Sequence, residues 1–270
     1  MKIALVGLGR TGRIVAEYLL QQKVLTLALC RPGSPYADRD LGDVLNSGPV
    51  GITVESTDHL ERKLFQYKPD VLIDFSSRTF LRENIHILAK VGVNVVTAVT
   101  DYEPADMEKF KTIAGKGHIG IVYAPNITYG VNVLMLMAQI AAELLGDYDF
   151  TVVEEHHKYK KDRPSGTAKK IVDRIRQGLT KPQEIPTYAV RAGGIVGRHK
   201  VLICGEHDQI EISHESYSRL AFAQGAYKAA CFIAGKTGFF EMSDIFEYER
   251  MLRQQQADYL DDQALEEDLA

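Results

Sequence analysis

Residues 2–12 read Lys2-Ile3-Ala4-Leu5-Val6-Gly7-Leu8-Gly9-Arg10-Thr11-Gly12, and this stretch decides the fold. An apolar, strand-like run is followed at once by G-x-G-x-x-G and then by an amphipathic segment at 13–20. Strand, glycine motif and helix in this order are typical of a dinucleotide-binding βαβ unit; a plain tight turn is the alternative. In such a unit the first glycine permits the turn, the second lets the backbone approach a pyrophosphate, and the third lets the helix pack on the strand. We therefore predict cofactor contacts from Gly7, Gly9, Arg10, Thr11 and Gly12.

The end of the next predicted strand, residues 25–29, bears on which nicotinamide cofactor is used. NAD-specific sites usually place Asp or Glu here, to hold the ribose 2′-hydroxyl. This chain has Cys30 followed by Arg31, and Arg10 lies in the glycine loop. A missing acid and a nearby cation favour a 2′-phosphate, although Arg31 as a solvated loop cation is the alternative. The sequence predicts NADPH, with NADH possible.

Further strand–helix alternation extends this pattern. Strands are predicted at 71–76, 93–99 and 119–123, with helices at 80–91 and 106–114. This alternation indicates a Rossmann-type, doubly wound parallel sheet of the α/β class. Ligands bind at the carboxyl ends of the strands in such sheets. The further predicted cofactor contacts, all at strand ends, are Phe75, Ser76, Ala98, Thr100, Pro125 and Asn126.

The pattern changes after residue 127. A long apolar helix is predicted at 129–145, and strand-like runs follow at 149–153, 188–191, 194–197, 199–204, 208–215 and 226–234. We interpret residues 128–237 as a C-terminal α+β domain with a mixed sheet, which binds the substrate. Residues 1–127, completed by 238–270, form the dinucleotide-binding domain. The acidic tail at 254–270 has little apolar face and is predicted to be an exposed or frayed helix.

One segment of the second domain concentrates ionisable side chains. It reads Glu154-Glu155-His156-His157-Lys158-Tyr159-Lys160-Lys161-Asp162-Arg163-Pro164-Ser165-Gly166-Thr167. Pro164 suits the first residues of a helix, so the residues after it are predicted to lie at a helix N-terminus. Free backbone N–H groups and the helix dipole attract an anion there. The segment predicts a site for a carboxylate or phosphate with a proton donor beside it; a surface-polar histidine pair is the alternative.

Composition narrows the classes of protein that fit. The chain has 270 residues, 45% of them hydrophobic and 25% charged, as in an ordinary globular protein. Its net charge of −4 argues against a nucleic-acid partner. Three scattered cysteines form no disulfide framework, and no spacing suggests a metal. A signal peptide and a membrane-spanning run are both absent, so a reducing cytoplasm is the expected location.

The histidine segment resembles the signature E-x-H-H-x-x-K-x-D-x-P-S-G-T of the 4-hydroxy-tetrahydrodipicolinate reductase (dihydrodipicolinate reductase) family. The glycine loop and four other stretches look like the same family, and the resemblance covers roughly residues 1–247. Those four stretches are Ile73-Asp74-Phe75-Ser76, Ala124-Pro125-Asn126-Ile127-Thr128-Tyr129-Gly130-Val131-Asn132, Arg191-Ala192-Gly193-Gly194-Ile195-Val196-Gly197-Arg198-His199 and Ile212-Ser213-His214.

The resemblance implies an NAD(P)H-dependent oxidoreductase of lysine and diaminopimelate biosynthesis. Such an enzyme reduces a cyclic, unsaturated dicarboxylate to tetrahydrodipicolinate, and it is usually a homotetramer built through the second domains. By position, His156 is the expected proton donor and Lys160 its partner. The chemistry fits these residue types, because hydride addition leaves a nitrogen-bearing anion that needs a proton. The residues expected to bind the substrate carboxylates are His157, Ser165, Gly166, Thr167 and Thr100.

One strand end departs from the family pattern. Where the family usually has G-T-T-G, this chain has Ala98-Val99-Thr100-Asp101. A Cβ at Ala98 narrows the space for nicotinamide, and the carboxylate of Asp101 repels a dicarboxylate. These differences motivate two other hypotheses: a paralogue that reduces another imine or carbonyl compound, and a non-catalytic sensor that binds NADPH.

Overall fold

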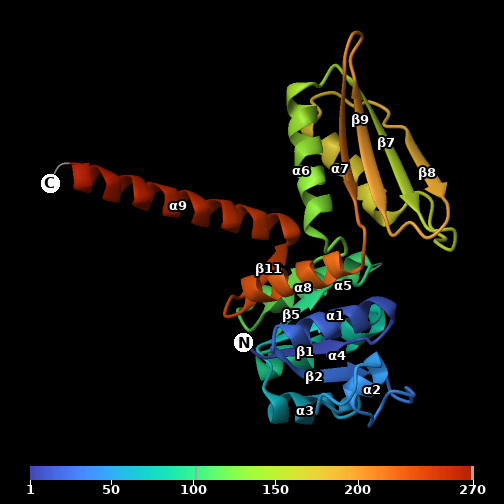
Figure 1. The fold of residues 1–270 in the computed structure, drawn as a ribbon, viewed down its shortest axis with the longest axis vertical. Coiled ribbons are helices and arrows are strands. Elements are labelled where there is room, and N and C mark those ends of the chain that lie inside the picture. The colour runs from blue at the N-terminus through green and yellow to red at the C-terminus, as the bar shows by residue number, and fades with distance from the viewer. Residues whose placement is uncertain (101, 269–270) are drawn as a thin grey trace. The chain divides into compact units, whose positions relative to one another are not determined.

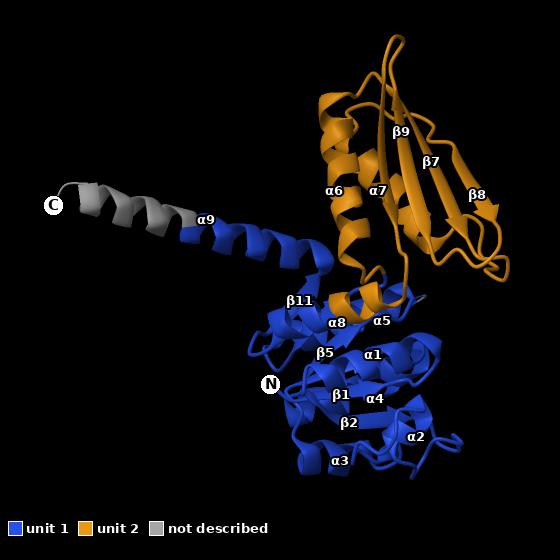
Figure 2. Ribbon diagram, in the orientation of Figure 1, with its two compact units in different colours: residues 1–125, 226–270 blue, residues 126–225 orange. Residues whose placement is uncertain are grey.

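The computed structural model describes residues 1–100 and 102–268, which separate into two units (Figures 1 and 2). The first unit comprises residues 1–125 together with 226–270, and the second comprises residues 126–225. The predicted domains divided the chain at 127/128 and 237/238, so residues 226–237 stand in the first unit here. Within the described residues, no helix combines the length and apolarity needed to cross a bilayer.

The first unit is built on a seven-stranded parallel sheet with the order β11-β6-β5-β4-β1-β2-β3. The order reverses between β1 and β4, which makes their carboxyl ends the switch point where such sheets bind ligands. The predicted Rossmann-type fold is confirmed. The strands are β1 (Ile3–Val6), β2 (Leu25–Cys30), β3 (Val54–Ser56), β4 (Val71–Asp74), β5 (Asn94–Thr97), β6 (Gly120–Tyr123) and β11 (Gly238–Glu241).

Helices cover both faces of this sheet. The crossover through α1 runs from β1 toward β2, and the crossover through α4 runs from β4 the other way. Because such crossovers are right-handed, the two helices lie on opposite faces. Helices α3, α4 and α5 contact one another in series, and α8 lies beside α1, where the rings of Tyr18 and Tyr227 are 5.9 Å apart. The helices of this unit are α1 (Arg10–Gln21), α2 (Leu41–Leu45), α3 (Leu60–Tyr67), α4 (Arg78–Val91), α5 (Pro104–Gly115) and α9 (Met242–Asp268), together with the part of α8 (Leu220–Ile233) from residue 226 onward.

Two predictions about local structure are wrong. Residues 226–234 are not a strand but lie largely in α8. This segment is rich in alanine, a strong helix former, and its buried residues Ala226, Ala229, Ala230 and Ile233 recur at helical rather than strand spacing. Residues 194–197 are also not a strand, because Gly193 has φ +48 and turns the chain after β8. Strands β3 and β11, each short, were not predicted.

The second unit is a four-stranded sheet with two helices on one face (Figure 1). Its strands are β7 (Asp149–His156), β8 (Thr187–Arg191), β9 (Arg198–Cys204) and β10 (Gln209–Glu215), and its helices are α6 (Tyr129–Leu144) and α7 (Gly166–Gly178). The strand order is β10-β9-β7-β8, with β7 and β8 parallel and the other pairs antiparallel. The mixed sheet is therefore confirmed. Alternate residues of β7, including Phe150 and Val152, are buried under the helices.

Candidate functional site

The glycine turn of the first unit has the shape that a dinucleotide needs. Gly7 has φ +97, and a Cβ there would lie 2.6 Å from the carbonyl of Phe75. At Gly12 a Cβ would lie 1.8 Å from the carbonyl oxygen of Gly7, so only glycine allows α1 to approach the turn this closely. Gly9 differs from both, because nothing lies within 4 Å of a Cβ built on it. The open side of Gly9 fits the close approach of a pyrophosphate.

Helix α1 adds hydrogen-bond donors at the same point. Its first intrahelical bond runs from the Arg13 amide to the Gly9 carbonyl at 3.0 Å. The amides of Arg10, Thr11 and Gly12 therefore lack acceptors within the helix, and the positive end of the helix dipole lies there. The residues present thus fit a cofactor that carries phosphate groups.

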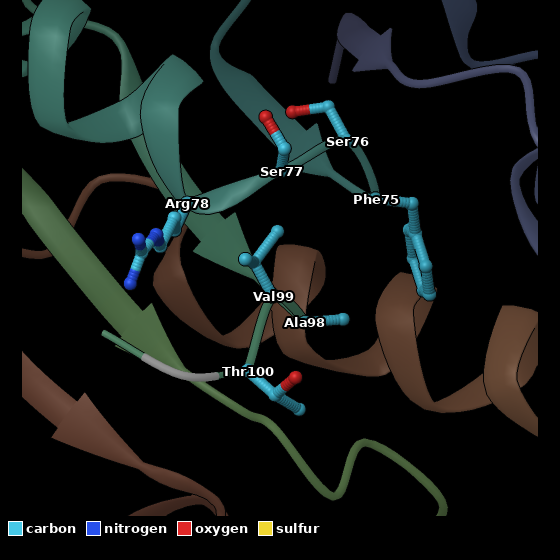
Figure 3. A pocket seen from close by; sticks show the side chains of 7 residues that line it. All are labelled: Phe75, Ser76, Ser77, Arg78, Ala98, Val99 and Thr100. Carbon is cyan, nitrogen blue, oxygen red and sulfur yellow. The ribbon is translucent and has the colours of Figure 1, made fainter. Parts of the chain in front are cut away.

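A cavity of about 470 Å³ lies at the carboxyl ends of β4 and β5 (Figure 3). It is lined by Phe75, Ser76, Ser77, Arg78, Ala98, Val99 and Thr100. Four of these residues were predicted as cofactor contacts, and Ser77, Arg78 and Val99 were missed. Arg78 is the first residue of α4, and a cation at the start of a helix that follows a strand end was the available signal. Asp101, the next residue of this strand end, lies outside the described residues.

The buried carboxyl of Asp74 joins the two loops of this cavity. Its Oδ1 accepts from the Ser76 amide at 2.9 Å and from the Ser76 hydroxyl at 2.6 Å. Its Oδ2 accepts from the hydroxyl of Thr97 at 3.3 Å. Burial raises the pKa of Asp74 to about 6, against the opposing effect of these hydrogen bonds. Asp74 therefore links the end of β4 to the end of β5.

Two exposed cations follow the ends of neighbouring strands: Arg31 after β2, and Arg10 at the start of α1, which follows β1. Cys30 is buried, and burial raises the pKa of its thiol. Arg31 and Arg10 are exposed, and neither forms an ion pair with any other residue that the structure describes. No carboxylate occupies the strand-end position that would hold a ribose 2′-hydroxyl.

In the second unit, β7 and α7 bring the histidine segment together. His156 is the last residue of β7 and is buried, and His157 follows it directly. Ser165 caps α7, because its hydroxyl accepts from the Ala168 amide at 3.1 Å. The predicted placement of Ser165, Gly166 and Thr167 at a helix N-terminus is confirmed.

A fully buried carboxylate, that of Glu154, lies next to His156. It accepts a hydrogen bond from His156 Nδ1 and two from Arg191, at 2.9 Å and 2.6 Å. The amide of Ser165 also donates to it, at 3.1 Å. Burial opposes ionisation of Glu154, but Arg191 and His156 together hold its pKa below the ordinary value. Neither Glu154 nor Arg191 was predicted as a site residue.

The environment of His156 favours its neutral form in the absence of substrate. Burial lowers the pKa of His156, and the carboxylate of Glu154 opposes this effect. His199, on β9, lies with its ring centroid 5.2 Å from that of His156. Burial, followed by the charge of His156, lowers the pKa of His199 to about 3. Both ring nitrogens of His199 are buried without a hydrogen-bond partner among the described residues.

Lys160 and Asp162 are paired in the loop between β7 and α7. The Nζ of Lys160 lies 2.9 Å from Oδ1 of Asp162. Burial opposes ionisation of Asp162, but Lys160 and the backbone amides of Asp162 and Gly166 hold its pKa below the ordinary value. The carboxylate of Asp162 thus contacts Lys160, the predicted partner of His156, and Gly166, a predicted substrate-binding residue.

Asn126 lies beside the N-terminus of α7. Its Oδ1 accepts from the hydroxyl of Thr167 at 2.7 Å, and its Nδ2 is buried without a partner among the described residues. Asn126 was predicted as a cofactor contact, and within the second unit it contacts a predicted substrate-binding residue. No cluster of metal-ligating side chains occurs in the described part of the chain.

Both units match models of the same protein family. Residues 1–127 match the family model described as "Dihydrodipicolinate reductase, N-terminus", and residues 130–246 match "Dihydrodipicolinate reductase, C-terminus". The 4-hydroxy-tetrahydrodipicolinate reductase of Ralstonia nicotianae is 39% identical over 267 residues, which cover 91% of this chain and 99% of that protein. The enzyme of the same name from Methanocaldococcus jannaschii is 33% identical over 265 residues, which cover 91% and 97%.

Solved structures agree on the fold. A dipicolinate-bound dihydrodipicolinate reductase from Paenisporosarcina sp. TG-14 has a TM-score of 0.73 at 23% identity and covers 89% of this chain and 97% of that one. An amine dehydrogenase from Mycobacterium smegmatis has a TM-score of 0.64 at 16% identity, with coverage of 88% and 94%.

Proposed function

The chain belongs to the dihydrodipicolinate reductase family, and from this premise we propose how its own residues carry out the reaction. It is an NAD(P)H-dependent oxidoreductase, a 4-hydroxy-tetrahydrodipicolinate reductase of lysine and diaminopimelate biosynthesis. The resemblance carried by the histidine segment is thereby confirmed. Which residues act, which cofactor is preferred and how the chain assembles remain proposals.

The dicarboxylate substrate is held by the segment between β7 and α7. The capped N-terminus of α7 offers the amides of Gly166 and Thr167 to one carboxylate. Lys160 supplies a positive charge for the ligand, and His157, next in the chain to His156, is proposed as a further contact to a substrate carboxylate. Thr100, which lines the cavity at the end of β5, is a further proposed substrate contact.

His156 donates the proton that completes the reduction. A bound nicotinamide cofactor supplies the hydride, and the anion left on the ring needs one proton. His156 carries Nδ1 against Glu154, which leaves Nε2 as the atom that transfers the proton. The negative charge of a bound dicarboxylate raises the pKa of His156, so the His156 ring becomes protonated when the substrate binds. The observation that carries the proposal is this buried histidine beside a capped helix N-terminus.

Turnover of freshly generated 4-hydroxy-tetrahydrodipicolinate, followed at the nicotinamide absorbance, tests these roles. His156→Gln and Lys160→Met are each expected to lower kcat by about 100-fold or more and to leave NADPH affinity unchanged. Lys158→Met is the matched control, because Lys158 lies over the ring of Tyr159 at 5.0 Å. Wild-type kcat in His156→Gln would remove His156 from the mechanism.

Ala98 supports an alternative to this function, which the same experiment tests. Ala98 lines the cavity where the family pattern has glycine. If the wild type binds NADPH but does not turn over this dicarboxylate, the chain is a relative that reduces another imine or carbonyl compound, or a non-catalytic sensor. A substrate panel at high enzyme concentration separates those two cases.

NADPH is the proposed cofactor, held by the glycine turn, by Pro125 and Asn126, and by Arg10 and Arg31 at its 2′-phosphate. The support is the absence of a strand-end acid together with two unpaired cations among the described residues. Arg31→Ala is expected to weaken NADPH binding by about tenfold, or about 1.4 kcal/mol, and to change NADH binding less than twofold. Equal losses for both cofactors in a fluorescence titration would contradict this assignment.

A homotetramer formed through the second unit is proposed as well. The uncovered face of its sheet carries Tyr188 and Val190, which are 60% and 43% exposed. Val153 pairs with Tyr188 across β7 and β8 and extends the same apolar surface. Exposed apolar side chains on an uncovered sheet face support an interaction there.

A further inference from the structure

Glu154 lies at the centre of a buried charged cluster whose role goes beyond its single contact with His156. Its side chain and that of Arg191 are almost wholly inaccessible to solvent. Both carboxylate oxygens accept from the guanidinium, one also faces His156 Nδ1, and the other also accepts from the Ser165 amide. Buried charges are costly unless paired, so a cluster with every lone pair engaged has a specific role to serve.

The charge state of Glu154 determines the tautomer of His156. The bidentate Arg191 pair keeps the carboxylate ionised, and an ionised carboxylate is only an acceptor. The contact between Glu154 and His156 therefore requires the proton of the neutral ring to be on Nδ1. Nε2 is left to exchange protons, and it lies 3.2 Å from the position of a Cβ built on Gly197, so glycine leaves space around it.

Arg191 extends this control to the loop that carries Lys160. It is the last residue of β8 and pairs in register with His156. Its Nε donates to the carbonyl of Lys160 at 3.3 Å, and its Nη2 donates to the carbonyl of Asp162. With the Ser165 amide bound to Glu154, both ends of the loop between β7 and α7 are tied to one ion pair.

We propose that Glu154 is a positioning residue that holds His156 as the Nδ1–H tautomer and, through Arg191 and Ser165, sets the loop that carries Lys160. This inference rests on the proposed role of His156 as proton donor. The charged and titratable groups facing His156 are Glu154 on its own strand, Arg191 on β8, His199 on β9 and Lys160 on the loop.

Glu154→Gln tests the inference, because it keeps the size of the side chain and removes the charge. An amide can present its NH2 group to His156, which moves the proton of the neutral ring to Nε2. We expect kcat to fall about 100-fold while KM and NADPH affinity change less than threefold. We also expect the high-pH limit of kcat to move to lower pH, because the carboxylate no longer stabilises the imidazolium.

Nitrogen NMR of the histidine rings supplies a readout that general loss of structure does not mimic. In the wild type the His156 signals, assigned by comparison with His156→Gln, should show a protonated Nδ1, and in Glu154→Gln a protonated Nε2. Glu155→Gln is the matched control, because Glu155 is the neighbouring residue on the opposite face of β7 and is partly exposed. It should retain the wild-type kcat, pH profile and tautomer.

The outcomes separate this inference from the proposed function. If His156→Gln is inactive while Glu154→Gln keeps the wild-type kcat and the Nδ1–H tautomer, Glu154 is not a positioning residue. If His156→Gln is fully active, His156 is not the proton donor and the proposed function is wrong on this point. The tautomer measurement then still tests whether Glu154 sets the tautomer of His156. Should Glu154→Gln not fold because Arg191 is left unpaired, the double variant Glu154→Gln with Arg191→Met removes the buried cation, and the same tautomer change is expected.

Discussion

At the scale of single residues, two glycines of the same turn have different roles: Gly12 is needed for folding and Gly9 for cofactor binding. Gly12→Ala places a Cβ 1.8 Å from a backbone oxygen, so we expect a loss of about 1–3 kcal/mol in the free energy of unfolding. Gly9→Ala meets open space and should change stability by less than about 0.5 kcal/mol. The same Gly9→Ala change should weaken NADPH binding, because the added Cβ occupies the approach of the pyrophosphate.

Urea unfolding and NADPH titration of both variants provide the measurement. A Gly9→Ala protein that binds NADPH as the wild type does would show that the pyrophosphate does not approach this backbone.

His199 makes the stability of the second unit depend on pH. Its pKa is lowered to about 3 by burial, whereas the unfolded chain has about 6.5. The folded state therefore stays neutral while the unfolded state gains a proton, so stability is complete above pH 6.5 and is lost as pH falls toward 3. Relative to His199→Leu, the wild type should lose roughly 3 kcal/mol between pH 7 and pH 4.

Denaturant unfolding at several pH values checks this effect. Parallel curves of stability against pH for the wild type and His199→Leu would mean that His199 is protonated in the folded protein.

At the residue scale, the sequence indicates which segment carries the chemistry but not the contacts inside it. Glu154 stands two residues before His156 on a strand, so a shared face was foreseeable. Arg191 was not, because its place beside His156 depends on the parallel pairing of β7 with β8. The link between Asn126 and Thr167 likewise joins residues 41 positions apart.

Helix α9 is held through its first turn, which gives a prediction at the scale of elements. Met242 is 4% exposed and Met251, in the same helix, is 49% exposed. Met242→Ala should cost about 2–5 kcal/mol through cavity formation, whereas Met251→Ala should cost less than about 0.5 kcal/mol. Thermal or urea unfolding compares the pair, and equal costs would show that the exposed part of α9 packs against another surface in solution.

Elements were predictable where periodicity and helix signals were strong. The strands at β1, β2, β4, β5 and β6 are continuous apolar runs, and each was expected close to its observed position. Helix α8 was not recognised, because residues 226–234 were interpreted alone as a short, mostly apolar run, and such a run fits a buried strand as well as a helix. The short edge strands β3 and β11 depend on pairing with a neighbour more than on their own sequence.

At the scale of the whole molecule, assembly is the property to measure. Tyr188→Glu combined with Val190→Glu places charges on the uncovered sheet face and should dissociate a homotetramer into smaller species. Phe65→Glu is the control, because Phe65 is 53% exposed in the first unit. Size-exclusion chromatography with light scattering reports the mass. A wild type that runs as a monomer would end the proposal, and an unaltered tetramer in the double variant would place the interface elsewhere.

Asp162 pairs with Lys160 and the Gly166 amide, the two groups that we propose to hold a substrate carboxylate, so its own carboxylate would compete with the substrate there. On this proposal, a substrate carboxylate displaces the carboxylate of Asp162 when it binds. The carboxylate of Asp162 in turn displaces the product, which speeds product release. Asp162→Asn removes the competing carboxylate and should therefore slow the dissociation of the product. We expect steady-state kcat to fall severalfold while the single-turnover rate of hydride transfer, followed by stopped flow, stays unchanged. A parallel fall in both rates would instead make Asp162 a partner in the chemistry.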